Sequence, residues 1–268
     1  MLPNLIIIGA MKCGTSSLHR YLNLHPQIHM ASLKELDFFV SEKNWGKGLD
    51  WYEEQFLSSA NSIKIYGESS PNYTKHHIFS GVPQRMHSMV PEAKLIYILR
   101  DPVKRILSHY YHQAVDSKET LALQECISNP KNNYVQTTLY YEQLQKFLEF
   151  YDSQNILVLS LESLNSDPQS VLKQVFEFLD VDSSFEHPNF GKRYHLASDK
   201  RKINKAGRMV AKLPAGLRLC NLLPQLFTEA IDYPSITPEI SATINDYLAD
   251  DLKQLRAFTE NNFAEWSM

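Results

Sequence analysis

Four short apolar runs rich in β-branched residues constrain the fold of this chain more than any other feature. They occupy residues 4–8, 62–68, 93–100 and 155–161. Runs of this length and continuity are typical of strands that are buried on both faces of a parallel sheet. Helical patterns separate or follow them, at 15–24, 102–115, 135–151 and 168–179. The alternation predicts an α/β fold with three layers, in which helices flank a central, mainly parallel sheet.

The pattern changes after about residue 182. Residues 183–207 are polar and rich in His, Lys and Arg, and helices follow, the last of them at 237–259. No linker composition separates the two parts. We therefore expect one domain over 1–268, with an α/β nucleotide-binding core at 1–182 and a basic loop with C-terminal helices at 183–268.

The first predicted strand leads into the loop "GAMKCGTSSL", residues 9–18. Two glycines have the spacing of a P-loop, but Thr15 stands where a Walker A motif has its lysine, and Lys12 comes earlier. Such a loop can still wrap a phosphate, because glycines allow the turn and the next helix offers free N–H groups. We expect Lys12 to approach the end of a phosphate chain. The other predicted donors are Cys13, Gly14, Thr15, Ser16 and Ser17.

A second anion site is predicted in "ILRDPVKRILSHYY". Arg100 ends a strand, and Asp101 and Pro102 are a good N-cap and first helical residue. Ser108 then lies about two turns into the helix, so Arg100 and Ser108 can both face the crevice where α/β proteins bind ligands. Spacing alone leaves a surface role for both residues equally open. We expect Arg105 to be an exposed helix residue.

Several ordered motifs resemble the sulfotransferases that use 3′-phosphoadenosine 5′-phosphosulfate (PAPS). Besides the loop, they are "LHPQI", "KELDFF", "KGLDWYEEQF", "YGESSPNY" and "AKLIYILRDPVKRILSHYYH", which are similar to the heparan sulfate branch of that family. The resemblance is strong over residues 4–115 and looser beyond. It implies that the loop at 9–18 binds the 5′-phosphosulfate of the donor. It also implies that Arg100 and Ser108 hold the 3′-phosphate.

A third basic element, at residues 191–208, follows in "GKRYHLASDKRKINKAGR". Related sulfotransferases close the nucleotide site with a basic loop near this position, but this sequence departs from their usual lysine–glycine pattern. A run of charges is also often simply solvated. The sequence leaves open which cations reach the donor among Lys192, Arg193, Lys200, Arg201 and Lys202. We take Lys192 and Arg201 as the candidates.

Sulfuryl transfer requires a base for the acceptor and a cation beside the leaving oxygen. Lys12 is the expected cation. The resemblance implies Glu35, in "KELDFF", as the catalytic base. Glu68 is the second candidate, as a base or as a residue that orients Lys12 or the acceptor, although it could instead only cap local backbone. His109 and His112 rank lower, because the histidine base of cytosolic sulfotransferases belongs to a different motif.

Composition limits the remaining choices. The net charge of −3 argues against a general nucleic-acid-binding surface. The three cysteines show no zinc or disulfide pattern, so we expect packing roles, a reducing compartment and no metal. No apolar run is long enough to span a bilayer, and no basic region precedes the first short apolar run. We therefore expect no signal peptide and a cytoplasmic location.

The resemblance implies an enzyme that moves a sulfuryl group from PAPS to a hydroxyl or an amine, leaving adenosine 3′,5′-bisphosphate (PAP). The favoured acceptor is a carbohydrate or glycolipid, and a lipid or secondary metabolite is the alternative. A P-loop kinase would need the Walker lysine and Mg²⁺ ligands. A non-catalytic nucleotide-binding protein would tolerate the loss of Lys12 and Glu35, and this chain has both. The oligomeric state is left open.

Overall fold

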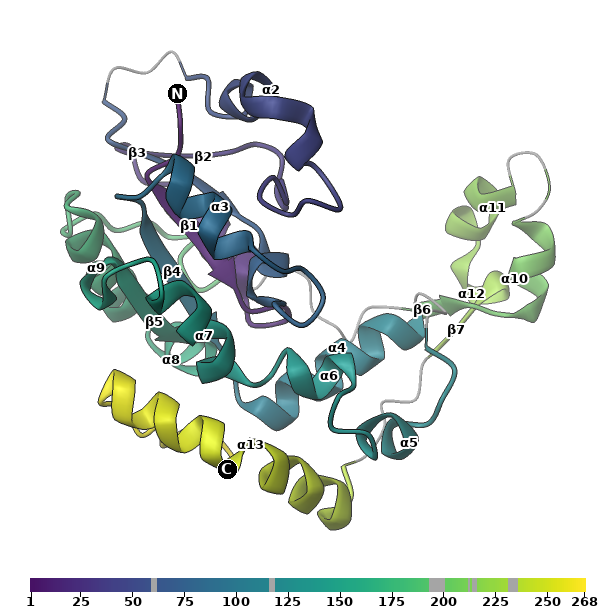
Figure 1. Ribbon diagram of the computed structural model, residues 1–268. Coiled ribbons are helices and arrows are strands. Elements are labelled where there is room, and N and C mark those ends of the chain that lie inside the picture. Colours follow the sequence, from purple (N-terminus) through teal and green to yellow (C-terminus); the bar gives the residue numbers. More distant parts are fainter. Residues whose placement is uncertain (59–61, 116–118, 193–200, 212, 214–215, 231–235) are drawn as a thin grey trace.

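A five-stranded parallel sheet forms the centre of the molecule (Figure 1). The computed structural model describes residues 1–268 except 59–61, 116–118, 193–200, 212, 214–215 and 231–235. The strand order is β2-β3-β1-β4-β5. The strands are β1 (Leu5–Gly9), β2 (Ile28–Met30), β3 (Ile65–Ser69), β4 (Lys94–Leu99) and β5 (Ile156–Ser160). The three-layer α/β fold predicted from the sequence is confirmed.

Both faces of the sheet are buried, which explains the continuous apolar runs. Along β1, Leu5 and Ile7 enter one hydrophobic cluster while Ile6 and Ile8 enter the other. All four side chains are fully buried. Successive residues of a strand point to opposite faces, so a strand covered on both sides requires an apolar residue at every position.

Helices cover the two faces separately. The cluster around Leu5 is closed by α1 (Thr15–Leu22), α8 (Leu161–Ser166) and α9 (Pro168–Leu179). The cluster around Ile6 is closed by α3 (Val82–Met89), α7 (Tyr140–Leu148) and the long α13 (Pro238–Thr259). The remaining helices before α10 are α2 (Gly48–Glu54), α4 (Pro102–Val115), α5 (Leu123–Ile127) and α6 (Asn133–Gln136). Short 3₁₀ turns occupy Trp45–Lys47, Pro71–Thr74 and Ser153–Asn155.

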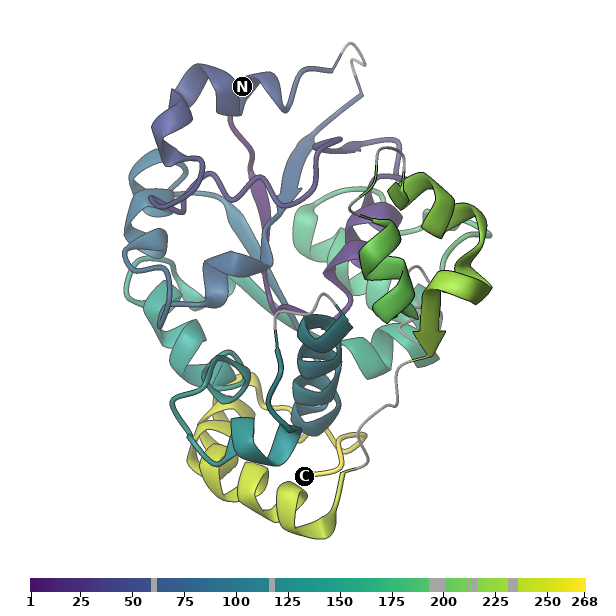
Figure 2. The ribbon, with the colours of Figure 1, turned by 90° about the vertical axis from the view of Figure 1, so that its right-hand side faces the viewer.

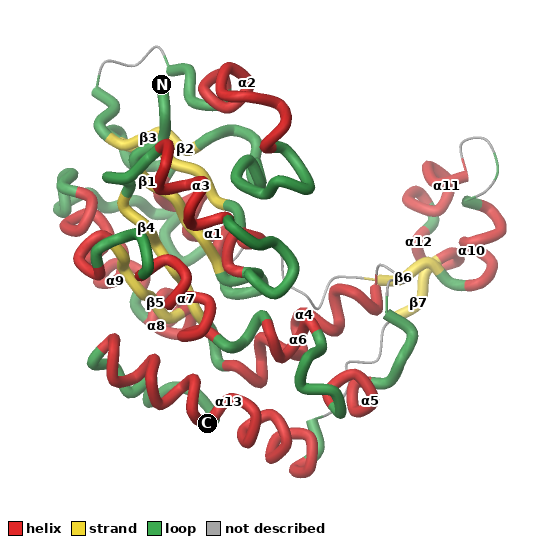
Figure 3. Tube along the Cα trace, viewed as in Figure 1, coloured by secondary structure: helices red, strands yellow, loops and turns green. Residues whose placement is uncertain are grey.

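The C-terminal part contains a small unit and a returning tail. Strands β6 (Arg201–Ile203) and β7 (Thr228–Ala230) pair antiparallel. Between them lie α10 (Lys205–Val210), α11 (Gly216–Leu222) and α12 (Pro224–Phe227), which stand apart from the central sheet in Figure 3. The end of the chain returns to the sheet, where the Ser267 N–H donates to Asp101 Oδ2 at 2.7 Å.

One predicted helix is wrong in extent. Residues 135–151 do not form a single helix, because the chain breaks between α6 and α7. The Tyr134 carbonyl accepts from Arg105 Nη2 and from the Thr138 hydroxyl, each at 2.6 Å. The Thr138 N–H turns to Val135 O at 2.7 Å instead of continuing the helical ladder. Side-chain donors therefore compete with the backbone at this point.

Among the described residues, no helix combines the length and apolar character needed to cross a membrane.

Candidate active site

The loop between β1 and α1 is shaped for close approach of a ligand to its backbone. Lys12 and Gly14 both have left-handed φ angles, of 71° and 87°. The φ of Gly14 favours glycine, and a Cβ there would also lie 2.4 Å from Leu161 Cδ1, so that side chain would have to move. The first turn of α1 leaves the N–H groups of Thr15 and Ser16 without intrahelical acceptors. These are the donors that an anion at a helix N-terminus requires.

Arg100 lies beside this loop. It follows β4, and its Nη1 donates to Lys12 O at 3.4 Å. The Tyr140 hydroxyl donates to Arg100 O at 2.8 Å and fixes the backbone at the end of the strand. Ser108 is buried on α4. The ends of β1 and β4 thus bring a guanidinium to the anion-binding loop.

Arg105 corrects the sequence prediction, because it is fully buried and not an exposed helix residue. Its guanidinium donates to Thr138 Oγ1 at 2.8 Å, to Tyr134 O at 2.6 Å and to Met11 O at 3.4 Å. These acceptors are all neutral. Burial and the nearby Arg105 charge lower the pKa of His109, whose Nδ1 lies 3.4 Å from Arg105 Nη1. Arg105 therefore supports the loop from inside with a charge that no carboxylate offsets in these contacts.

Glu35 lies at the edge of the site on a strained turn. Its φ is 62°, and its N–H donates to Ser69 O at 3.0 Å, which attaches it to the end of β3. Its side chain is 54% exposed and pairs with Lys34 Nζ at 2.9 Å. Partial burial alone would raise the pKa of Glu35, but Lys34, Lys75 and Lys43 lower it below the ordinary value. The carboxylate is therefore ionised at neutral pH and can accept a proton.

Glu68 has a different environment from Glu35. It is fully buried, and its Oε1 accepts from the Tyr52 hydroxyl at 2.6 Å and from the Tyr73 hydroxyl at 2.7 Å. The Ser70 hydroxyl donates to Oε2 at 2.6 Å. Burial raises the pKa of Glu68, although these hydrogen bonds oppose the rise. Its contacts join side chains in the core and do not cap backbone, which suits a structural carboxylate better than a base.

A polar chain that the sequence did not reveal joins the Glu35 turn to the loop. The Asp37 N–H donates to Ser70 Oγ at 3.0 Å, and its carboxylate accepts from Lys43 and from Asn72 Nδ2. Lys75 Nζ donates to Asn72 Oδ1 at 2.8 Å and contacts Met11 Sδ at 3.0 Å. The chain therefore reaches from the acidic turn to the anion-binding loop.

Lys75 is the unusual member of this chain. It is 6% exposed, and burial with the charges of Arg105 and Lys43 lowers its pKa to about 8, while Asp37 and Glu35 oppose the shift. A lysine with this pKa is partly charged near neutral to mildly basic pH. No motif marks it, because Met11, Arg105 and Lys43 lie on other segments of the chain.

A cavity of about 650 Å³ opens between α1 and the segment after β2. The polar groups in its wall include the predicted donor residue Ser16, Ser32, the cations Arg20 and Lys34, and His19. His19 is nearly buried and its Nδ1 has no hydrogen-bond partner. Burial and the charge of Lys34 lower its pKa to about 4, so its ring is neutral at pH 7. The cavity thus combines cations and hydroxyls, with the neutral ring of His19 in its wall.

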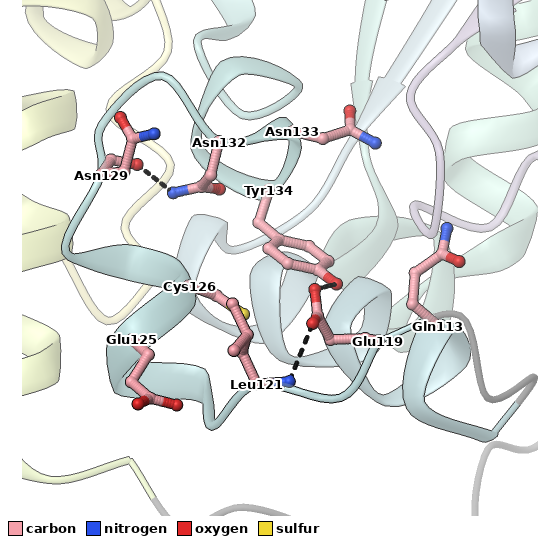
Figure 4. Close-up of a pocket in the computed structure, with 9 residues that line it drawn as sticks. All are labelled: Gln113, Glu119, Leu121, Glu125, Cys126, Asn129, Asn132, Asn133 and Tyr134. Atoms are coloured by element: carbon pink, nitrogen blue, oxygen red, sulfur yellow. Dashed lines mark hydrogen bonds between the residues drawn. The ribbon is translucent and has the colours of Figure 1, made fainter.

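A second cavity, of about 440 Å³, lies near the C-terminal end of α4 (Figure 4). The described residues of its wall include no lysine or arginine, and none of the predicted site residues is among them. Glu119 accepts from the Tyr134 hydroxyl and the Leu121 N–H, both at 3.0 Å. The polar groups named here form hydrogen bonds with one another. The described part of the wall therefore does not have the features of an anion site. Its lining residues are Gln113, Glu119, Leu121, Glu125, Cys126, Asn129, Asn132, Asn133 and Tyr134.

The structure describes only part of the predicted basic loop. Lys192 is exposed, and its carbonyl accepts from the Tyr21 hydroxyl at 2.8 Å, which holds the start of the loop against α1. Residues 193–200, with Arg193 and Lys200, lie outside the described residues. Arg201 opens β6, but its side chain also lies outside the description. The donor contacts predicted for this loop stay predictions.

Two observations concern metals and thiols. Within the described ranges, no group of three or more His, Cys, Asp or Glu residues is placed to hold a metal ion.

The three cysteines, Cys13, Cys126 and Cys220, are free and buried. Burial raises the pKa of the Cys13 thiol to about 11, so this thiol in the loop is protonated at neutral pH.

The fold and the loop define a P-loop-like α/β protein with a candidate anion site at the ends of β1 and β4. A family model described as "Sulfotransferase domain" matches residues 2–205, more than half of the chain. The chain therefore belongs to the sulfotransferase family, in agreement with the resemblance seen in its motifs.

Known proteins support the same family. Human heparan sulfate glucosamine 3-O-sulfotransferase 5 is 34% identical over 193 residues, covering 67% of this chain and 54% of that protein. Human bifunctional heparan sulfate N-deacetylase/N-sulfotransferase 1 is 29% identical over 269 residues, covering 92% of this chain and 28% of that protein. This chain thus spans about half or less of the length of these relatives. The crystal structure of a sulfotransferase from Alicyclobacillus acidocaldarius has the same fold, with a TM-score of 0.73 and 24% identity over the full length of both chains.

Proposed function

We propose that the protein transfers a sulfuryl group from PAPS to a hydroxyl or amine of a saccharide acceptor, with Glu35 as general base. The observation that carries the proposal is the anion-binding loop of a sulfotransferase-family chain, with Arg100 bonded to its Lys12 carbonyl. The acidic turn at Glu35 is linked to the same loop through Asp37, Asn72 and Lys75.

The donor side fits a nucleotide that carries several negative charges. Loop N–H groups and the hydroxyls of Thr15, Ser16 and Ser17 would hold the 5′-phosphosulfate. Arg100 and Ser108 would hold the 3′-phosphate, and Lys192 and Arg201 would add contacts from the basic loop. The buried charge of Arg105 supports this assignment, because its direct acceptors are neutral and a bound anion nearby would lower its electrostatic cost.

The chemical roles follow from electrostatics and position. Glu35 is ionised at neutral pH and would take the proton of the acceptor group as that group attacks. Lys12 would stabilise the charge that develops on the leaving oxygen, and it can also give a proton. Glu68 would keep Ser70, Tyr52 and Tyr73 in place. The loop and the acidic turn would thereby keep a fixed relative position, as in-line transfer requires.

A saccharide is the acceptor class that the site and the relatives favour. Both human relatives are named for heparan sulfate, one as an O-sulfotransferase and the other as an N-sulfotransferase. The cavity beside α1 offers Ser16, Ser32 and His19 for sugar hydroxyls, and Arg20 and Lys34 for an anionic substituent. A glycolipid, another lipid or a secondary metabolite is the alternative acceptor. The cytoplasmic location stays a prediction.

Thermal unfolding with added nucleotides tests the donor assignment against that of a P-loop kinase. A ligand that binds only the folded state raises the melting temperature in proportion to its affinity and concentration. We expect PAP to stabilise the protein without Mg²⁺ and ATP with Mg²⁺ to have much less effect. Stabilisation by ATP with Mg²⁺ and none by PAP would reject the proposal.

A further inference from the structure

The small unit between β6 and β7 exposes an unusual number of large apolar side chains. Leu222 is 76% exposed and Met209 is 74% exposed. The other exposed members are Leu213, Leu219, Leu223 and Leu226. We call these six side chains the leucine patch. Scattered exposed leucines are normal, but a concentration of them on one short unit marks an interaction surface.

The unit that carries the leucine patch has internal structure. The Asn204 side chain accepts from the Gly207 N–H at 2.8 Å and donates to Leu226 O at 2.9 Å. Cys220 is buried between α10 and α11, and its Sγ lies 3.6 Å from Gly207 O. The helices therefore already pack against one another through small and polar residues. The leucines are left on the outside.

The charges of the same segment are mostly positive. From 201 to 230 the sequence has six cations and one acidic residue, Glu229; the cations are Arg201, Lys202, Lys205, Arg208, Lys212 and Arg218. Among the exposed side chains that the structure describes, Arg218 lies next to Leu219 on α11. Apolar side chains with flanking cations are typical of surfaces that bind at the headgroup level of anionic lipids.

We propose that the leucine patch docks the protein on an anionic membrane surface. The unit stands at one end of the molecule, apart from the sheet, in Figure 1, and Figure 2 shows α10 and α11 on the outside of the molecule. A two-fold contact between two copies through this patch would bring two segments of net positive charge together, which disfavours a dimer. An anionic bilayer instead offers both an apolar layer and opposite charge.

Flotation of the full chain with lipid vesicles tests this proposal. We expect binding to vesicles of phosphatidylcholine mixed with phosphatidylserine, weaker binding to phosphatidylcholine alone, and a decrease at high salt. The double variant Leu222→Asp/Leu226→Asp should bind at least about tenfold more weakly, because two buried leucines would each contribute substantially. Arg218→Glu should reduce binding only to the anionic vesicles.

Leu57→Asp is the matched control, because Leu57 is 72% exposed and lies outside the unit. It should bind vesicles like the wild type, and all variants should keep the wild-type melting temperature. The proposal is overturned if the wild type does not bind anionic vesicles, or if the double variant and Leu57→Asp bind equally well. A wild-type dimer in analytical ultracentrifugation that the double variant dissociates would assign the patch to a second copy instead. Because the assay measures binding alone, its outcome is independent of the proposed transferase activity.

Discussion

The proposed donor side and the proposed acceptor side of the site differ in how their charged groups are paired. On the donor side, the hydrogen bonds of the buried Arg105 go to neutral groups, and Arg100 donates to a backbone carbonyl. On the acceptor side, Lys34 pairs with Glu35 and Lys43 pairs with Asp37. The first arrangement leaves positive charge for an anion to neutralise. The second pairs each carboxylate with a lysine on the side where the acceptor would lose its proton. Binding of the donor and transfer of the proton are therefore assigned to separate residues.

The largest expected effect comes from Glu35→Gln, which removes the base and preserves the shape of the side chain. We expect turnover to fall by roughly a hundredfold or more, within the range that general base catalysis supplies. The affinity for PAP should stay near the wild-type value. Initial rates and calorimetric titration with PAP measure the two effects, and Glu42→Gln, another exposed glutamate, is the control. Near-normal turnover would transfer the role of base to another group.

The second effect concerns Glu68, for which we expect a structural role in contrast to the role of Glu35 as base. Glu68→Gln places an amide N–H₂ among the hydroxyls of Tyr52, Tyr73 and Ser70, which donate to this carboxylate. We expect the free energy of unfolding to fall by about 2 kcal/mol, in line with a disturbed buried hydrogen-bond network. Chemical denaturation measures the change. A variant of wild-type stability with no turnover would instead favour Glu68 as the base.

The third effect tests the donor side through Arg100→Ala. We expect PAP to bind about tenfold more weakly, because a charge-assisted hydrogen bond to phosphate is lost. The affinity for adenosine 5′-phosphosulfate, which has no 3′-phosphate, should change much less. Calorimetric titration of both ligands gives the comparison, with Lys104→Ala as a nearby exposed control. Equal losses of affinity for the two ligands would show that Arg100 does not bind the 3′-phosphate.

The smallest effect is a pH dependence of stability from Lys75. Its pKa is about 8 in the folded protein, against 10.5 as the ordinary value. Between these two values the unfolded chain binds more protons at this residue, so its contribution to the free energy of unfolding rises with pH. Below pH 8 this contribution is constant. We expect Lys75→Met to reduce the increase in the free energy of unfolding with pH across this window, as measured by urea denaturation. An unchanged dependence on pH would show that the pKa of Lys75 is not perturbed.

The sequence predicted the strands and the loop better than the contacts that join distant segments, for a physical reason. The strands, the loop at 9–18 and the position of Arg100 follow from local pattern, because apolar runs, glycines and a strand end act within a few residues. The sequence did not predict the burial of Arg105, because helical spacing does not show that the carbonyl oxygens of Tyr134 and Met11 lie within hydrogen-bonding distance of its guanidinium. The link from Asp37 through Asn72 to Lys75 was also missed, because it joins segments that only the folded sheet brings together.

We propose that this chain transfers sulfuryl groups from PAPS with Glu35 as the base. The most direct measurement is incubation of the protein with isotopically labelled PAPS and a panel of saccharides, with mass spectrometry of the acceptors. We expect the wild type to add one labelled sulfuryl group to at least one saccharide, and Glu35→Gln to do so at a rate lower by roughly a hundredfold. Equal transfer by the two proteins, or phosphoryl transfer from ATP in place of sulfuryl transfer, would contradict it.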